Sequence, residues 1–372
     1  MNQQPRANVT LYDLLAREWA CEAAVSDACF SHDGSVTAFS LDDGTVALAV
    51  TADEEPPQER IRMTPSVGKA TIRPRSAPPR PLIKTTVLSE RPMPIVATHD
   101  GVFLAGTSAG EVRAIDADGA AHETPLAFDG PVTALDHRAD ITAASDGTRI
   151  QIARDGQARE LEGLAGGAVG CLALSSDASR LAVAEGNTVR IIDLSDSQKT
   201  SVAADFPAAV TGMAWSGDGR WIACPLETSG FGLIEAETGR SALVGGYPGP
   251  VATAAFSTAA HALVTSGAFR ITAWSTAELP FDDAKAGVLE TGRRGLVVID
   301  RIAVHPTKKL VAAAYENGQI VIAQIGHGDE LVLRPSGAPV TALAWAPDGK
   351  HLSIGDGAGK AALSSFPPQI FK

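Results

Sequence analysis

The stretches AWSGDGRW at residues 214–221 and AWAPDGKH at residues 344–351 decide the fold. Each contains a short apolar run, Asp-Gly, and then the start of a second apolar run. Asp-Gly between such runs is the strongest short-range sequence signal for a β-hairpin. Related turns recur along the chain, for example CFSHDG at 29–34 and LALSSDA at 172–178. The recurrence indicates a fold built from one repeated antiparallel unit.

An apolar residue, usually valine, opens a short predicted strand once in each repeat. These residues are Val25, Ile95, Val132, Val169, Val210, Val251, Ile299 and Val340. A second, a third and a fourth strand follow across tight turns before the next unit begins. A unit of about 41 residues with four antiparallel strands has the size of one propeller blade. The sequence therefore predicts an all-β fold, a single β-propeller over residues 1–372 with eight blades, or seven if the first unit packs irregularly.

The repeat resembles that of the WD-repeat β-propeller family over residues 15–367. The apolar-Ser-x-Asp-Gly turn recurs, and third strands end in Ala114-Ile115-Asp116 and Ile191-Ile192-Asp193, similar to the family's Trp-Asp ending with tryptophan replaced. The Gly-His dipeptide that usually precedes each unit of the family does not do so here. The chain therefore looks like a divergent member. The resemblance implies a non-enzymatic scaffold or adaptor for protein–protein interaction.

The N-terminus is expected to close the ring. The last unit ends near Phe366 without a fourth strand. We predict that residues 14–20 supply this strand by pairing with the final blade, which removes both sheet edges. The competing interpretation is an amphipathic helix, because Thr10 and Asp13 have the spacing of a capping box.

Composition and charge exclude several classes of function. A formal net charge of −12 opposes general attraction to nucleic acid or to an anionic membrane. No stretch approaches the roughly 18 uncharged apolar residues of a membrane span, and the first residues lack the apolar core of a signal peptide. Four cysteines in 372 residues do not suggest a disulfide framework. We therefore expect a cytoplasmic monomer.

The interval from Val25 to Ile95 is the longest, because residues 52–83 form an insertion between the third and fourth strands of the first blade. The insertion opens with Asp53-Glu54-Glu55 and then becomes basic and proline-rich, with no acidic residue from Arg60 to Lys84. The basic residues of this segment are Arg60, Arg62, Lys69, Arg73, Arg75, Arg80 and Lys84. Such a composition predicts an extended or disordered segment.

This insertion is the one concentrated positive region on an acidic chain, so we expect it to bind a partner protein with an acidic surface. The alternatives are a tolerated surface insertion, a segment folded back on the protein's own acidic surface, and, less favoured, a nucleic-acid arm. In an antiparallel four-stranded blade, the first turn and the third-to-fourth connection leave from the same end. The insertion is therefore expected on the same face as the first turns of the blades.

Charged residues also interrupt the small or apolar pattern of two inner strands. Asp27 lies in the first strand of blade one, and Asp300 and Arg301 lie in the first strand of blade seven. These residues either line a partner-binding patch at the mouth of the channel, or their charges are satisfied by one another or by the backbone. The sequence leaves the two interpretations open.

Few residues suggest catalysis or a cofactor. Ser31-His32-Asp33 has the letters of a catalytic triad, but adjacent residues on a hairpin turn point apart. The turn histidines His32, His99 and His137 are candidates for a divalent metal site across neighbouring blades, or are simply tolerated in solvated turns. No pair has a diagnostic spacing, so we expect no catalytic residue, no metal and no cofactor. The alternative function is a propeller enzyme with a metal-dependent hydrolase or lactonase-like site at the channel.

Overall fold

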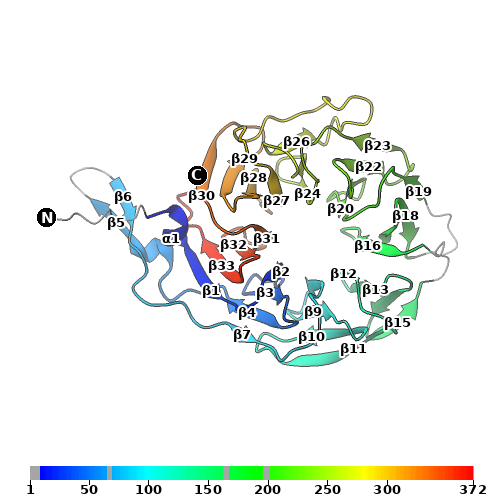
Figure 1. Cartoon of the computed structure of the whole chain (residues 1–372), viewed down its shortest axis with the longest axis horizontal. Coiled ribbons are helices and arrows are strands. Elements are labelled where there is room, and N and C mark those ends of the chain that lie inside the picture. Colours follow the sequence, from blue (N-terminus) through cyan, green and yellow to red (C-terminus); the bar gives the residue numbers. More distant parts are fainter. Residues whose placement is uncertain (1–8, 65–68, 162–166, 196–201, 372) are drawn as a thin grey trace.

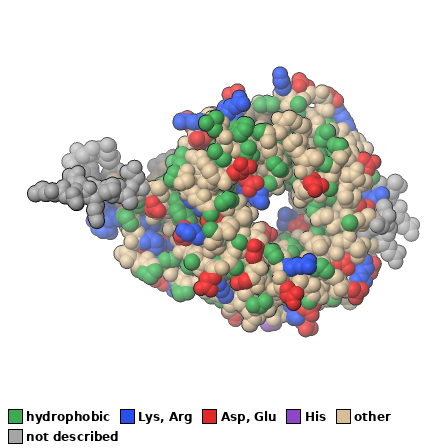
Figure 2. Space-filling view, viewed as in Figure 1, with side chains coloured by type: hydrophobic (Ala, Val, Ile, Leu, Met, Phe, Trp, Pro, Cys, Tyr) green, Lys and Arg blue, Asp and Glu red, His purple; other side chains and the backbone are tan. Residues whose placement is uncertain are grey.

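A ring of antiparallel sheets around a central opening forms the computed structural model of this chain (Figures 1 and 2). The structure describes residues 9–64, 69–161, 167–195 and 202–371. Within these ranges eight blades follow one another in chain order. The eight-bladed, all-β propeller is confirmed, and the seven-bladed alternative is wrong.

Blades one to four run from the inner to the outer strand in sequence order. Blade one contains β2 (Val25–Phe30), β3 (Val36–Leu41), β4 (Val46–Val50) and β7 (Ile83–Lys84). Blade two contains β8 (Ile95–Ala97), β9 (Phe103–Gly106), β10 (Glu111–Ile115) and β11 (Ala121–Ala127). Blade three contains β12 (Ala134–Arg138), β13 (Ile141–Ser145), β14 (Ile150–Arg154) and β15 (Gln157–Glu160). Blade four contains β16 (Val169–Leu174), β17 (Arg180–Glu185), β18 (Thr188–Asp193) and β19 (Val202–Asp205).

Blades five to seven continue the same order, and blade eight takes its outer strand from the other end of the chain. Blade five contains β20 (Ala214–Trp215), β21 (Trp221–Pro225), β22 (Phe231–Glu235) and β23 (Ser241–Val244). Blade six contains β24 (Ala254–Ser257), β25 (Ala262–Thr265) and β26 (Thr272–Ser275). Blade seven contains β27 (Ile299–Val304), β28 (Leu310–Tyr315), β29 (Ile320–Gln324) and β30 (Glu330–Arg334). Blade eight contains β31 (Val340–Trp345), β32 (His351–Asp356), β33 (Lys360–Ser365) and β1 (Ala16–Ala20).

Blade six departs from the regular pattern at its outer edge. Its named strands end at β26, and the fourth position is taken by a segment that makes only isolated bridges. Val288 pairs with Trp274, and Thr291 pairs with Ile271. Blade six therefore has three regular strands and a fourth, outer segment that is paired at isolated positions only.

The Ser-x-Asp-Gly turn is held by its own side chains. In blade five the hydroxyl of Ser216 donates to the carboxylate of Asp218 and accepts the N–H of Trp221 at 2.9 Å. Gly219 has a φ of +67°, a conformation that a glycine adopts without strain. Ser31 makes the same two kinds of bond in blade one. These local bonds explain why the motif recurs with the blade.

The tryptophans of the two quoted stretches tie successive blades together. The indole N–H of Trp215 donates to the carbonyl of Ala173 in the preceding blade at 2.9 Å. Trp345 makes the equivalent bond to the carbonyl of Ala303 at 3.1 Å. Each of these residues therefore joins the inner strand of its own blade to the inner strand before it.

The valine that opens an inner strand packs against the preceding blade. At Gly355 in β32, an added Cβ would lie 2.3 Å from the side chain of Val25. At Gly106 in β9, an added Cβ would lie 2.4 Å from Val132. Second strands thus need a very small residue at these positions because the next blade occupies the space.

Both interpretations of the N-terminal segment are confirmed, for successive parts of it. Helix α1 (Leu11–Leu15) begins at Thr10, whose side chain and backbone form a complete capping box with Asp13. The strand β1 follows at once and pairs with β33 from Ala16 opposite Ser364 to Ala20 opposite Lys360. The ring is therefore closed by its first strand. We call residues 11–21 the closing segment.

The helix turns an apolar face to the last two blades. Tyr12 and Leu15 are buried in one cluster with Leu333, Trp345 and other residues of blades seven and eight.

No helix in the described ranges has the length and hydrophobicity needed to cross a lipid bilayer.

Substitution Leu15→Ala tests the contribution of α1 to closure. Leu15 is 1% exposed, and truncation of a buried leucine costs about 3 kcal/mol. We expect a loss of this size in the free energy of unfolding, measured by urea titration, with increased aggregation because β33 loses its cover. Val9→Ala, at a residue that is 57% exposed, is the control and should change stability by less than about 0.5 kcal/mol. Equal stability of Leu15→Ala and the wild type would contradict the closure mechanism.

Candidate interaction site on the first and last blades

The insertion between β4 and β7 is folded in the parts that the structure describes. A 3₁₀ turn, η1 (Pro57–Arg60), leads into β5 (Ile61–Thr64) and β6 (Lys69–Ile72), which pair as an antiparallel hairpin. Figure 1 shows this hairpin projecting from the ring beside α1. Residues 73–82 return to the blade without regular secondary structure. The composition predicted an extended or disordered segment and gave no indication of this turn or of the pairing between the two strands.

Charge pairing within the insertion explains why it folds. Arg75 donates to both carboxylate oxygens of Asp53 at 2.7 Å, and Arg80 contacts Glu54 at 2.9 Å. Burial alone would raise the pKa of Asp53, but the hydrogen bond from Arg75 and nearby positive charge hold the pKa below its usual value. The acidic residues at the start of the insertion thus pair with basic residues that follow later in the same insertion.

Arg60 is a structural residue of the insertion. Its side chain is buried, with 6% of the residue exposed. The guanidinium donates to the backbone carbonyls of Glu55 at 3.0 Å, Arg73 at 2.5 Å and Leu14 at 2.6 Å. One side chain therefore joins both ends of the hairpin to the closing segment.

Three further side chains connect the closing segment to blade one and the insertion. Arg17 donates to the carbonyl of Thr51, Trp19 to that of Arg80, and Lys84 to that of Cys21, at 2.7, 2.6 and 2.9 Å respectively. Together with Arg60, these bonds run along most of the closing segment. The insertion thus lies over the strand that closes the ring.

Two of the predicted binding residues remain free on the surface. Arg62 and Arg73 are exposed, and neither has an ion-pair partner among the residues that the structure describes. Lys69 lies in β6, and its side chain falls outside the described part of the chain. Figure 2 shows basic side chains near this hairpin. The folded insertion therefore uses some cations internally and presents others to solvent.

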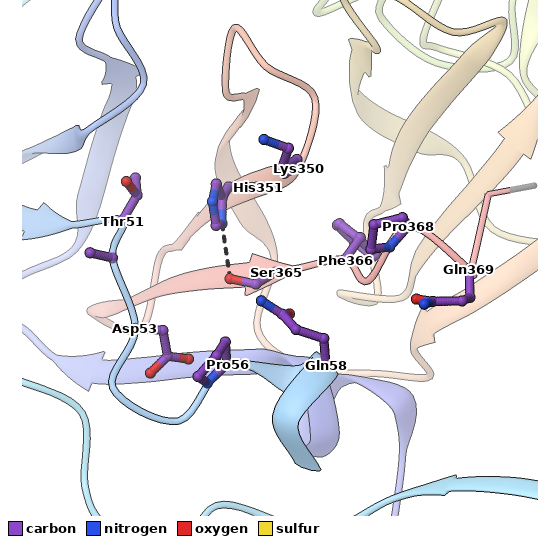
Figure 3. Close-up of a pocket in the computed structure, with 11 residues that line it drawn as sticks. Thr51, Asp53, Pro56, Gln58, Lys350, His351, Ser365, Phe366, Pro368 and Gln369 are labelled. Atoms are coloured by element: carbon purple, nitrogen blue, oxygen red, sulfur yellow. Dashed lines mark hydrogen bonds between the residues drawn. The ribbon is translucent and has the colours of Figure 1, made fainter. Parts of the chain in front are cut away.

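A pocket of about 730 Å³ lies where the insertion meets blade eight (Figure 3). Its walls come from residues 51–58, from Lys350 and His351, and from residues 365–369 at the end of the chain. We call it the insertion pocket. Because the start of the insertion and the first turn of blade eight line one pocket, they lie on the same face, as the connectivity predicted.

The insertion pocket brings together Ser365, His351 and Asp53 without making a catalytic triad. His351 contacts the hydroxyl of Ser365 through Nδ1 at 2.9 Å. Asp53 is held by Arg75, and no hydrogen bond joins it to His351 in the described structure. A triad needs the imidazole to bridge nucleophile and acid through its two nitrogens. Burial, the largest effect, lowers the pKa of His351 and favours the neutral ring.

The three predicted channel residues lie within electrostatic reach of one another. Arg301 contacts the carboxylate of Asp300 at 3.0 Å and donates to the carbonyl of Thr341 at 3.3 Å. Asp27 keeps contact with water, yet the protein atoms crowded around it raise its pKa to about 6. The N–H groups of Ala28 and Ile95 and the charge of Arg301 oppose that rise. Figure 2 shows charges of both signs around the opening.

A fourth residue of this kind, Asp136 in β12, was missed in the sequence. Its carboxylate accepts the N–H of Leu174 in blade four at 2.8 Å and the N–H of His137 at 2.9 Å. Burial raises its pKa. The sequence signal that could have identified Asp136 is the one that identified Asp27, namely an acidic residue within a predicted inner strand. Both carboxylates accept an N–H from the next blade.

The turn histidines of the first three blades form a row. The rings of His32 and His99 stack with centroids 4.0 Å apart, and His99 and His137 meet edge to face at 6.5 Å. Within the described ranges, no group of three or more histidine, cysteine or acidic side chains has an arrangement that could hold a metal ion. The stacking instead accounts for the close approach of these rings.

The comparisons with known proteins identify the fold. No family model matches the sequence, and no curated protein does. The solved structures of similar shape include the computationally designed protein Ika8, with a TM-score of 0.68 and 16% identity over 95% of this chain and 100% of that one. They also include the C-terminal WD40 domain of Sif2, with a TM-score of 0.65 and 13% identity over 94% and 99% of the two chains. A chain of the mitotic checkpoint complex matches with a TM-score of 0.56 and 15% identity over 98% and 95%. These likenesses show that the chain shares the β-propeller fold of the WD40 domain of Sif2.

Substitution Arg60→Ala tests the structural role of this arginine. The variant leaves three carbonyls without their charged donor, and bonds of this kind contribute about 2 kcal/mol. We expect faster amide hydrogen exchange in residues 52–64, 69–83 and the closing segment, together with a lower free energy of unfolding. Arg73→Ala is the matched control because its side chain is exposed, and it should change neither. Unchanged exchange in Arg60→Ala would show that the insertion is held by other contacts.

Substitution Asp27→Asn tests the electrostatics of the channel. The folded-state pKa of about 6 lies above the unfolded value of about 3.9. Protonation of Asp27 therefore stabilises the fold, with the full effect below about pH 4 and its loss as the pH rises through 6. The wild type should gain stability relative to Asp27→Asn when the pH falls from about 7 to about 4. Parallel denaturation curves of the two proteins over this range would contradict the raised pKa.

Proposed function

We propose that this chain is a non-enzymatic scaffold that binds a protein partner with an acidic surface through the insertion of blade one. The observation that carries the proposal is that some arginines of the insertion hold its structure together while others are exposed to solvent. Arg60 and Arg75 hold the insertion in place, whereas Arg62 and Arg73 point into solvent without a partner in the described structure. A binding element that is already folded loses less conformational entropy on association.

The surrounding charge supports an acidic target. The chain carries a net charge of −12, so the exposed arginines of the insertion lie on a protein whose overall charge is negative. Complementary charge steers a partner to one face and gives specificity more than raw affinity. The resemblance to WD40 propellers supports an interaction role in general, and the insertion supplies what is particular to this chain.

We also propose that the protein works as a monomer in a reducing compartment such as the cytoplasm. All four cysteines are free, and burial raises the pKa of Cys171 to about 12, so this thiol is unreactive at neutral pH. Free thiols of this kind are typical of intracellular proteins.

Replacing the exposed arginines tests the proposal. The triple variant Arg62→Ser, Arg73→Ser and Arg80→Ser removes three cations and leaves the anchors Arg60 and Arg75 intact. The ion pair of Arg80 with Glu54 is lost, but both side chains are exposed and such a surface pair contributes little to stability. We expect an unchanged melting temperature and a loss of roughly tenfold in the recovery of co-purifying proteins from native lysate. Recovery by the wild type should fall as salt rises, since exposed charges are screened beyond about 10 Å at 0.1 M salt.

A matched triple variant is the control for net charge. Arg91→Ser, Arg159→Ser and Arg294→Ser remove three exposed arginines from other parts of the ring. This control should recover the same proteins as the wild type. Equal recovery by both triple variants, or equal loss from both, would contradict a specific role of the insertion.

A further inference from the structure

We propose that the insertion pocket binds an extended segment of the partner that carries a large apolar side chain next to an acidic one. This inference rests on the proposed scaffold function and names what the pocket itself recognises. The pocket volume of about 730 Å³ lies within the range of known small-molecule binding pockets. It exists because the start of the insertion lies against blade eight and the end of the chain.

The lining of the pocket suits the backbone and one apolar side chain of a peptide. Phe366 is buried at the wall, and Pro56 and Pro368 add further apolar surface beside it. Gln58 and Gln369 come from different segments and are both exposed. Each amide can donate and accept a hydrogen bond. Exposed amides beside an apolar surface match an extended chain, which alternates N–H and C=O groups with side chains.

The charge of the pocket favours an acidic residue next to the apolar residue of the bound peptide. The carboxylate of Asp53 is already neutralised by Arg75 at 2.7 Å and by Arg17 at 4.0 Å. The cation left at the rim is Lys350, whose side chain is 67% exposed. Its contact with Asp348 at 3.2 Å is a surface ion pair, which contributes little and exchanges readily.

The positive charge continues beyond the pocket along the end of the chain. A second cavity of about 420 Å³ contains Lys308, Lys309 and Phe371. Lys308 donates to the carbonyl of Phe371 at 2.7 Å, which places its ammonium beside the last described residues. An acidic segment leaving the insertion pocket toward this cavity would therefore meet further cations. This continuity favours a peptide over a small isolated anion.

Selection from a random dodecapeptide display library tests the proposal. Wild-type protein should enrich sequences with aspartate or glutamate beside a large apolar residue, and the affinity of an enriched peptide is then measured by fluorescence anisotropy. Lys350→Glu should weaken that peptide about tenfold or more. Ala52→Trp fills the pocket from its exposed wall and should abolish binding, while the carbonyl of Ala52 that Arg17 contacts stays in place.

Two controls make the result specific. Lys285→Glu makes the same charge change at an exposed site in another blade and should alter the affinity by less than about twofold. The triple variant at Arg62, Arg73 and Arg80 should still bind the peptide, because these side chains do not line the pocket.

The outcomes separate this inference from the proposed function. No enriched sequence, enriched sequences without an acidic residue, or binding unaffected by Lys350→Glu and Ala52→Trp would overturn the pocket proposal. In that case salt-sensitive capture through the exposed arginines would leave the scaffold function standing. Pocket-dependent peptides together with capture that does not depend on Arg62, Arg73 and Arg80 would instead overturn the proposed role of the exposed arginines.

Discussion

The pairing of residues 16–20 with residues 360–364 is the constraint on which the rest of this molecule depends. It joins the two ends of the chain into one blade, and it gives β33 a hydrogen-bonded neighbour on its outer side. The insertion needs this seam, because Arg60 and Lys84 bind carbonyls of Leu14 and Cys21, which take their positions only in the closed ring. The insertion pocket needs it as well, since its walls come from the first blade and the last.

Much of the fold could be predicted because its signals are local. The turn formed by Ser216, Asp218 and Gly219 is stabilised by bonds within six residues, so its chemistry is visible in a short stretch of sequence. Repetition of that turn then fixed the size and number of the blades. The N-terminal segment shows the limit of such reasoning, because a helix cap and a closing strand were read as alternatives and are in fact consecutive. A short stretch of sequence does not determine at which residue the helix ends and the strand begins.

The candidate site was harder to predict because its contacts are distant in sequence and involve the backbone. The composition of the insertion indicated an extended or disordered segment. The contacts that hold Arg60 in place are to carbonyl groups, which every residue has and no sequence pattern distinguishes. The pairing of Asp53 with Arg75 did leave a trace, an acidic run before a basic one, which can be read as internal neutralisation as well as a surface for others. The inner-strand residues Asp300 and Arg301 could not be assigned from sequence alone, because mutual pairing and partner binding require the same residues.

Closure of the ring by its first strand also has a consequence for biosynthesis. β33 is the last strand of the ring to be synthesised, so β1 has no pairing partner while the rest of the ring is made. During that time the backbone of β1 and the apolar face of α1 are open to other chains, and contacts between the two ends of a polypeptide form slowly. Blades one to seven can form as the chain emerges, whereas blade eight can be completed only after β33 has been synthesised. Nascent chains should therefore gather in an open-ring state, which is the form that a chaperone would meet.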